Sequence, residues 1–236
     1  MKITTCVPKQ TKTLQEKFDF LNRVIDEHNP DIFLTPQEYF GGWQYEKIAV
    51  ELDEFMPTIK KLSKDSNTAI ITGGVIEGSP RRQILYFVDE GRIVGQIRKF
   101  AIPNYALDGY KVVAEETMVD RFQTFKVKGI NVAGFFCWEV FSDLLMCGLG
   151  LLEPDLTVSA IKFGIAGYPT KEKTKDGERI AGVSYGGKHS SGDNNIWLER
   201  LHMASKFEVK CPIACSTNSW DVGAKYEPLA GIMYPY

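Results

Sequence analysis

The chain has 236 residues, of which 44% are hydrophobic and 25% charged, a composition typical of a globular protein with a sizeable core. Its formal net charge of -2 gives no electrostatic reason to expect nucleic acid or an anionic membrane as a partner. The sequence lacks the roughly 18 consecutive apolar residues of a membrane helix and begins without the apolar stretch of a secretion signal, so we expect a cytoplasmic protein.

The first half of the chain alternates apolar runs of strand length with helical patterns. Residues 2–7 and 31–36 predict short strands, and apolar residues between 14 and 25 recur at helical spacing. A strand, a helix and a strand within so short a stretch form a βαβ unit, which implies parallel pairing. The other elements expected here are a helix over 46–62, a strand over 68–78, and a hairpin over 83–100 that turns at Asp89-Glu90-Gly91.

The second half continues this pattern after a less regular segment, 101–120. Two strands are expected around Lys128-Gly129, followed by a short helix over 141–152 with Ser142 or Asp143 near its start. The polar, glycine-rich region 167–195 is typical of a long loop. The remaining elements are strands over 155–161, 211–218 and 230–235 and a helix over 194–207. No linker or repeat interrupts the chain, so we expect a single α/β domain over residues 1–236.

Five cysteines are present, an odd number without CxxC spacing, and most should be buried as small hydrophobic side chains. Cys211 and Cys215 form a CxxxC pair without nearby histidines, so we expect strand positions and no metal site. Cys137 differs, because it ends an apolar run, GFFC, and a turn follows it. This is where a strand would present a nucleophile.

Three reactive side chains fall at predicted strand ends, where sites form in α/β sheets: Glu38, Lys99 and Cys137. A carboxylate can take the thiol proton, and an ammonium can favour the thiolate and then hold the oxyanion of a tetrahedral intermediate. The backbone N–H of Trp138 is a possible second donor. Glutamate, lysine and cysteine thus form an acyl-transfer set that needs no histidine. Taken singly, Glu38 and Lys99 would be interpreted as solvated surface charges.

The motifs around these residues resemble those of the nitrilase superfamily, the carbon–nitrogen hydrolases. DIFLTPQEYF is similar to the family's strand leading to Pro-Glu, with Gln37 inserted before Glu38. GRIVGQIRKFAIP is similar to its hairpin ending in Arg-Lys. In most members one residue and then His-Leu follow the lysine, and here Ala-Ile replaces His-Leu. AGFFCWEVF is similar, in a slightly tighter form, to its Gly-x-x-x-Cys-Tyr/Trp-Asp/Glu patch. WLERLHMASKFEVKCPIACSTN and AGIMYP are similar to its later helix and strands.

The resemblance implies a four-layer α-β-β-α sandwich that assembles as a homodimer or higher homo-oligomer through its outer helices. It implies Cys137 as nucleophile, Glu38 as general base and Lys99 as oxyanion stabiliser. A second active-site glutamate is expected at Glu115, with Glu116 and Asp108 as further candidates. Members usually continue beyond the strand at 230–235, so the chain is expected to be a short or truncated member.

The function expected first is hydrolysis of a small amide through a cysteine thioester, without cofactor or metal. Trp138 and Glu139 are expected to bind substrate, and Gly41-Gly42-Trp43 and Tyr168 are further candidates for the pocket wall. Hydrolysis of a nitrile, which Cys-Trp-Glu also resembles, acyl transfer to an amine, and a non-catalytic binding protein of the same fold remain as alternatives. Residues 182–188 fit GxxxxGK, but His189 replaces the magnesium-binding Ser or Thr, which argues against a phosphate loop.

Overall fold

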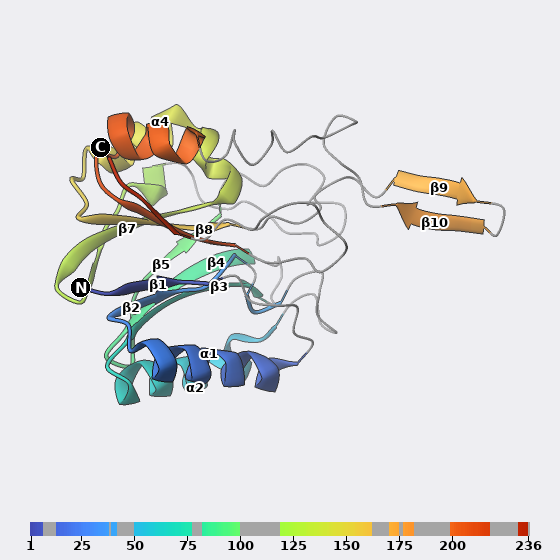
Figure 1. Ribbon diagram of the computed structural model, residues 1–236. Helices are drawn as coiled ribbons and strands as arrows, with labels where there is room; N and C mark the ends of the chain where they lie inside the picture. The colour runs from blue at the N-terminus through green and yellow to red at the C-terminus, as the bar shows by residue number, and fades with distance from the viewer. Residues whose placement is uncertain are drawn as a thin grey trace.

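Two five-stranded sheets pack face to face and carry helices on their outer faces in the computed structural model of this chain (Figure 1). The structure describes residues 1–6, 13–37, 39–41, 50–76, 82–99, 119–161, 170–174, 177–181, 199–217 and 231–235. The resulting order of layers is helix, sheet, sheet, helix, which confirms the expected α-β-β-α sandwich.

The first sheet has the strand order β1-β2-β3-β4-β5. Its strands are β1 (Ile3–Thr5), β2 (Ile32–Leu34), β3 (Ala69–Ile76), β4 (Arg82–Asp89) and β5 (Arg92–Arg98). The first three are parallel, and β4 and β5 form the expected antiparallel hairpin. Glu90 and Gly91 make its turn with φ of 49° and 74°, values that suit a tight hairpin connection.

The helices of the first outer layer are α1 (Leu14–His28) and α2 (Leu52–Asp65). Thr13 caps α1 through a reciprocal pair of hydrogen bonds with Glu16, and Asn29 ends it in the left-handed conformation. The prediction that the second helix starts at residue 46 is wrong. Val50 forms a parallel bridge with Ile76, so the chain is still extended there, and α2 begins two residues later.

The second sheet has the strand order β12-β11-β8-β7-β6. Its strands are β6 (Phe125–Val127), β7 (Ile130–Phe136), β8 (Leu156–Ile161), β11 (Ile213–Thr217) and β12 (Gly231–Met233). Strands β7, β8 and β11 are parallel, whereas β6 and β12 are antiparallel edge strands. The 3-10 helix η1 (Val119–Arg121) precedes β6, and the 3-10 helix η2 (Cys137–Phe141) follows β7.

The outer layer of the second sheet consists of α4 (Asp143–Gly150) and a helix over 199–208, whose last turn is the π-helix η3 (Ala204–Glu208). Ser142 caps α4 as expected, by accepting a hydrogen bond from the Leu145 N–H. Among the residues described, no helix is long and apolar enough to cross a bilayer.

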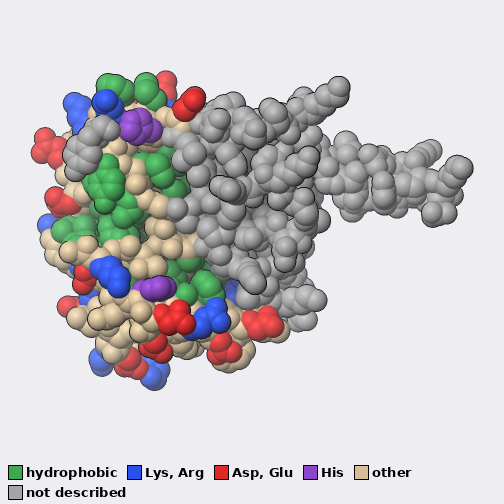
Figure 2. Space-filling model, viewed as in Figure 1, with side chains coloured by type: hydrophobic (Ala, Val, Ile, Leu, Met, Phe, Trp, Pro, Cys, Tyr) green, Lys and Arg blue, Asp and Glu red, His purple; other side chains and the backbone are tan. Residues whose placement is uncertain are grey.

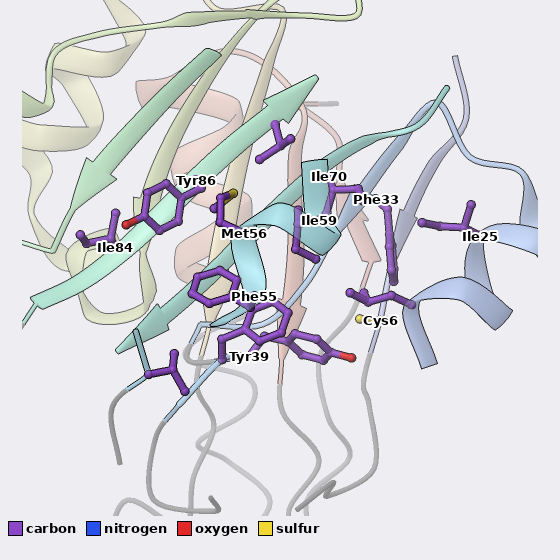
Figure 3. Close-up of a cluster of buried hydrophobic side chains, with 14 of the residues drawn as sticks. Cys6, Ile25, Phe33, Tyr39, Phe55, Met56, Ile59, Ile70, Ile84 and Tyr86 are labelled. Carbon is purple, nitrogen blue, oxygen red and sulfur yellow. The ribbon is translucent and has the colours of Figure 1, made fainter. Parts of the chain in front are cut away.

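Three apolar cores hold the four layers together. The first lies between α1, α2 and the first sheet and includes Phe33 and Phe55 (Figure 3). Phe40 belongs to the same core and stacks on Phe55 with 4.3 Å between ring centroids. The second lies between the two sheets, and the third lies between the second sheet and its outer helices. Strand β2 contributes side chains to two of these cores, because Phe33 faces the helices while Ile32 and Leu34 face the other sheet.

The region 167–195, predicted as a loop, contains a hairpin. Strands β9 (Thr170–Thr174) and β10 (Gly177–Ala181) pair with each other in antiparallel register and with neither five-stranded sheet. Strand β9 consists entirely of charged and polar residues, and the two apolar residues of β10, Ile180 and Ala181, are adjacent, so neither strand has the apolar alternation by which a half-buried strand is recognised.

Candidate active site

The carboxyl ends of the parallel strands meet at one edge of the sandwich. Cys6, just after β1, donates its backbone N–H to Ser216 Oγ near the end of β11, at 3.2 Å. This contact joins the two sheets at their carboxyl ends. Strand β5 runs parallel to β2 and β3, and β7 runs parallel to β11, so residues that follow β2, β5 and β7 reach this same edge.

Cys137 occupies the first position after β7, where the extended strand turns abruptly into η2. Its φ of 27° lies in the left-handed region, which non-glycine residues adopt at a cost and which clusters at functional sites. The residue is partly exposed, whereas Phe135 and Phe136 before it are fully buried. The fold therefore brings this thiol out of the core at a strained turn.

The other described cysteines differ from Cys137 in exposure. Cys6, Cys211 and Cys215 are buried, while Cys147 on α4 is exposed. Burial raises the pKa of the Cys6 thiol to about 12, that of Cys215 to about 11, and that of Cys211 in the same direction. These three thiols are thus held protonated and packed, as expected for structural cysteines.

Lys99 is the first residue after β5, and it is buried, with 5% of its surface exposed. Its backbone N–H donates to the Gln83 carbonyl at 2.9 Å. Its ammonium donates to Gln37 Oε1 at 3.3 Å, and the Gln37 amide donates in turn to Gln83 Oε1 at 2.9 Å. Two neutral amides therefore orient a buried ammonium, and in this network neither of them neutralises its charge.

The chain on both sides of position 38 is anchored in the protein. Gln37 belongs to the lysine network, and Tyr39 is buried and donates its hydroxyl to the Lys17 carbonyl at 3.0 Å. Phe40 donates its N–H to the Gly73 carbonyl, and a Cβ on Gly74 would lie 2.6 Å from the Phe40 carbonyl oxygen. A glycine in β3 is therefore what lets the segment after β2 lie against the sheet.

Glu139 forms a buried ion pair instead of lining an open surface. Both carboxylate oxygens lie 3.0 Å from Arg121 Nη1, and one of them accepts the Phe136 N–H at 2.8 Å. Arg121 and Glu139 are both fully buried. These bonds give the Glu139 carboxylate a place in holding the turn that carries Cys137, while the substrate contact expected of Glu139 stays a prediction.

Several predicted site residues lie outside the described residues, namely Glu38, Glu115, Glu116, Asp108, Trp43, Tyr168 and the segment 182–188. Trp138 belongs to η2, but its side chain is not described. Their roles stay predictions. Among the described residues, no group of three or more His, Cys, Asp or Glu side chains is arranged to hold a metal ion.

Gln37 and Arg121 are the site residues that the sequence did not reveal. Gln37 interrupts a Pro-Glu pattern and is 62 positions from its lysine partner. Arg121 follows an irregular segment, where an isolated arginine is ordinarily a surface residue. Neither contact produces a local pattern, although an inserted amide next to a predicted catalytic carboxylate was a visible anomaly.

Comparison with family models and with curated protein sequences finds no match for this chain. Solved structures do match its fold over nearly its whole length. A mutant of the amidase from Nesterenkonia sp. AN1, with the acetamide moiety of fluoroacetamide added covalently at its active-site cysteine, has a TM-score of 0.70 and 13% identity, and the match covers 100% of this chain and 82% of that one.

Two further structures show the same likeness. The protein XC1258 from Xanthomonas campestris, a CN-hydrolase superfamily protein with an arsenic adduct in its active site, has a TM-score of 0.70 and 11% identity, over 99% of this chain and 82% of that one. The C. elegans NitFhit protein has a TM-score of 0.72 and 12% identity, over 99% of this chain and 55% of that one. This chain thus has the fold of the nitrilase superfamily of carbon–nitrogen hydrolases.

Proposed function

We propose that this protein is a carbon–nitrogen hydrolase that cleaves a small amide through a thioester on Cys137. The observation that carries the proposal is the pair of strand ends at one edge of the sandwich. One presents a partly exposed thiol at a strained turn, and the other holds the buried ammonium of Lys99. The fold neighbour from Nesterenkonia carries a covalent acetamide adduct at its active-site cysteine, which supports the same role here.

In the proposed reaction, Glu38 takes the thiol proton while Cys137 Sγ attacks the amide carbon. The C=O bond opens, and the Lys99 ammonium stabilises the resulting oxyanion. When the tetrahedral intermediate collapses, the C–N bond breaks, Glu38 delivers the proton to the leaving nitrogen, and ammonia or an amine departs. Water then attacks the thioester, with Glu38 as base, and the thiol regains its proton as the carboxylic acid leaves.

The test is release of ammonia from matched series of small amides and nitriles. Cys137→Ala should lower turnover by about a thousandfold or more, because the variant lacks the proposed nucleophile. Cys147→Ala is the matched control, since that thiol is exposed on α4 and should not affect the reaction. Activity that survives in Cys137→Ala would refute the mechanism.

The same assay separates the alternatives. Faster ammonia release from nitriles than from the matched amides would assign the protein as a nitrilase, as the Cys137-Trp138-Glu139 sequence also allows. Transfer of the acyl group to an added amine in preference to water would assign an acyltransferase. A Cys137 thiol that reacts with iodoacetamide no faster than free cysteine would favour a binding protein of the same fold.

We also propose that the protein forms a homodimer through its second outer helical layer. Leu144, Leu151, Met203 and Phe207 are exposed there by 66%, 84%, 49% and 57%. In Figure 2, apolar side chains are exposed at the top of the molecule, over these helices, with charged side chains beside them. Exposed apolar surface of this kind marks an interface. Sedimentation should show a dimer that Leu151→Asp dissociates. Val94→Asp, at an exposed position of β5, is the control and should leave the dimer intact. A wild-type monomer at micromolar concentration would contradict this proposal.

A further inference from the structure

Arg121 joins the two strand ends that carry Lys99 and Cys137. Its Nη1 donates to the Arg98 carbonyl at 2.7 Å and to both Glu139 oxygens, and its Nη2 donates to the Gly134 carbonyl at 3.0 Å. Arg98 is the last residue of β5 in the first sheet, and Gly134 lies in β7 of the second. One guanidinium therefore bridges the two sheets beside the candidate site.

The geometry of these contacts restrains both catalytic candidates. The Arg98 carbonyl belongs to the peptide unit that continues into Lys99, so its position fixes where the lysine leaves the sheet. On the other side, Arg121 holds Glu139, whose carboxylate accepts the Phe136 N–H. The donor Phe136 and the acceptor Glu139 thus lie immediately before and two positions after Cys137, which has its φ at 27°. A planar fork of donors suits this task better than a point charge does.

A stabilising role alone would not require an ion pair at this position. Replacing a fully buried ion pair by apolar side chains of similar volume is often neutral or stabilising for a fold. The pair between Arg121 and Glu139, both at 0% exposure, is of this kind. What apolar side chains cannot supply is the set of directed bonds to three backbone groups from two sheets.

We propose that Arg121 is a positioning residue for the cysteine hydrolase site, acting with Glu139 as its counter-charge. It holds the left-handed turn at Cys137 and sets the end of β5 against it, so that thiol and ammonium keep a fixed separation. This inference rests on the proposed function. Since misplacement of a reacting group by about 1 Å can lower a rate a hundredfold, loss of the bridge should be visible in the reactivity of the thiol.

The experiment measures alkylation of each cysteine by iodoacetamide from pH 6 to pH 9, resolved by peptide mass analysis. Cys147, exposed on α4, serves as the reference thiol inside the same molecule. In the wild type, Cys137 should react faster than Cys147 and do so at lower pH. In the double variant Arg121→Met/Glu139→Met, the ratio of the two rates should fall at least about tenfold and the pH profile of Cys137 should move toward that of Cys147.

Matched variants separate positioning from folding. Arg200→Met/Glu208→Met removes another arginine–glutamate pair, 2.7 Å apart on the outer helices, and should leave the ratio unchanged. Arg121→Lys keeps the positive charge but loses the planar set of guanidinium donors, so it should lower the ratio of the Cys137 and Cys147 alkylation rates by an intermediate amount. This variant replaces the apolar double variant in the test if the double variant does not fold. Thermal unfolding of each variant shows that the measured protein is folded.

The outcomes distinguish the two proposals. If wild-type Cys137 is no more reactive than Cys147, the proposed function fails. If wild-type Cys137 is activated and the folded Arg121 variants retain its rate ratio and pH profile, the function stands and the positioning role of Arg121 is overturned.

Discussion

Lys17 offers a test of how this protein's stability depends on pH. Its side chain is buried, with its ammonium nitrogen 4.4 Å from the centre of the Tyr39 ring. Burial lowers its pKa from the ordinary 10.5 to about 7. Each unit by which the folded-state pKa falls below the unfolded-state pKa lowers the free energy of unfolding by about 1.4 kcal/mol when the group is protonated in the unfolded chain. The burial of Lys17 therefore lowers the free energy of unfolding by up to about 5 kcal/mol at neutral pH and below. The aromatic face of Tyr39 offsets part of this cost.

The sign of the pH dependence follows from proton binding. Between pH 7 and pH 10.5, the unfolded chain binds a proton at Lys17 that the folded chain does not, so the free energy of unfolding rises with pH. Above pH 9 the effect of Cys6 is opposite, because burial raises its pKa to about 12 and the folded state retains its proton. From pH 7 to pH 9 the Lys17 contribution should therefore amount to about 2 kcal/mol of added stability.

The assay is urea denaturation of the wild type, Lys17→Met and Lys64→Met at pH 7, 8 and 9 and fixed protein concentration. Lys17→Met should be more stable than the wild type at pH 7, and its advantage should shrink by about 2 kcal/mol by pH 9. Lys64→Met replaces a lysine that is exposed on α2, so its free energy of unfolding should change with pH in parallel with that of the wild type. Parallel curves for wild type and Lys17→Met over this range would refute the reasoning.

Three further substitutions test the site and its support. Gln37→Leu removes the acceptor of the Lys99 ammonium and should lower kcat for amide hydrolysis about tenfold to a hundredfold, whereas exposed Gln96→Leu should not. Gly134→Ala would place a Cβ 2.9 Å from a buried aromatic carbon of the facing sheet, so the free energy of unfolding should fall by about 1 to 3 kcal/mol in denaturant titrations. Ser216→Ala leaves two buried backbone groups at the end of β1 without their partner and should cost about 2 to 4 kcal/mol by the same measurement; losses under about 0.5 kcal/mol would contradict either stability prediction.

Much of the fold could be predicted because its determinants are local. Short apolar runs such as 32–34 gave the buried parallel strands, and Lys128-Gly129 gave the turn between β6 and β7. The cysteine at the end of such a run was likewise recognisable, because a strand followed by a turn is a pattern of neighbouring residues. These elements predicted an α/β domain, and the four layers were implied by the family resemblance.

What could not be predicted depends on residues far apart in the chain. The start of α2 was misplaced because the bridge between Val50 and Ile76 is invisible to helical periodicity. The hairpin of β9 and β10 lacks apolar alternation in both strands, although Asp176-Gly177 is a common turn sequence. The ion pair of Arg121 with Glu139 spans 18 positions, and the contact of the same guanidinium with the Arg98 carbonyl spans 23, so only the folded structure brings these groups together.

The most direct test of the proposed chemistry is to measure the mass of the intact enzyme by mass spectrometry during turnover. Wild-type protein quenched in acid while it hydrolyses a small amide should carry the acyl group, which is the mass of the substrate less that of ammonia. Peptide analysis should place that group on Cys137, and it should disappear when the amide is exhausted. Sustained turnover with no acyl group on Cys137, or with the group on another cysteine, would contradict the account.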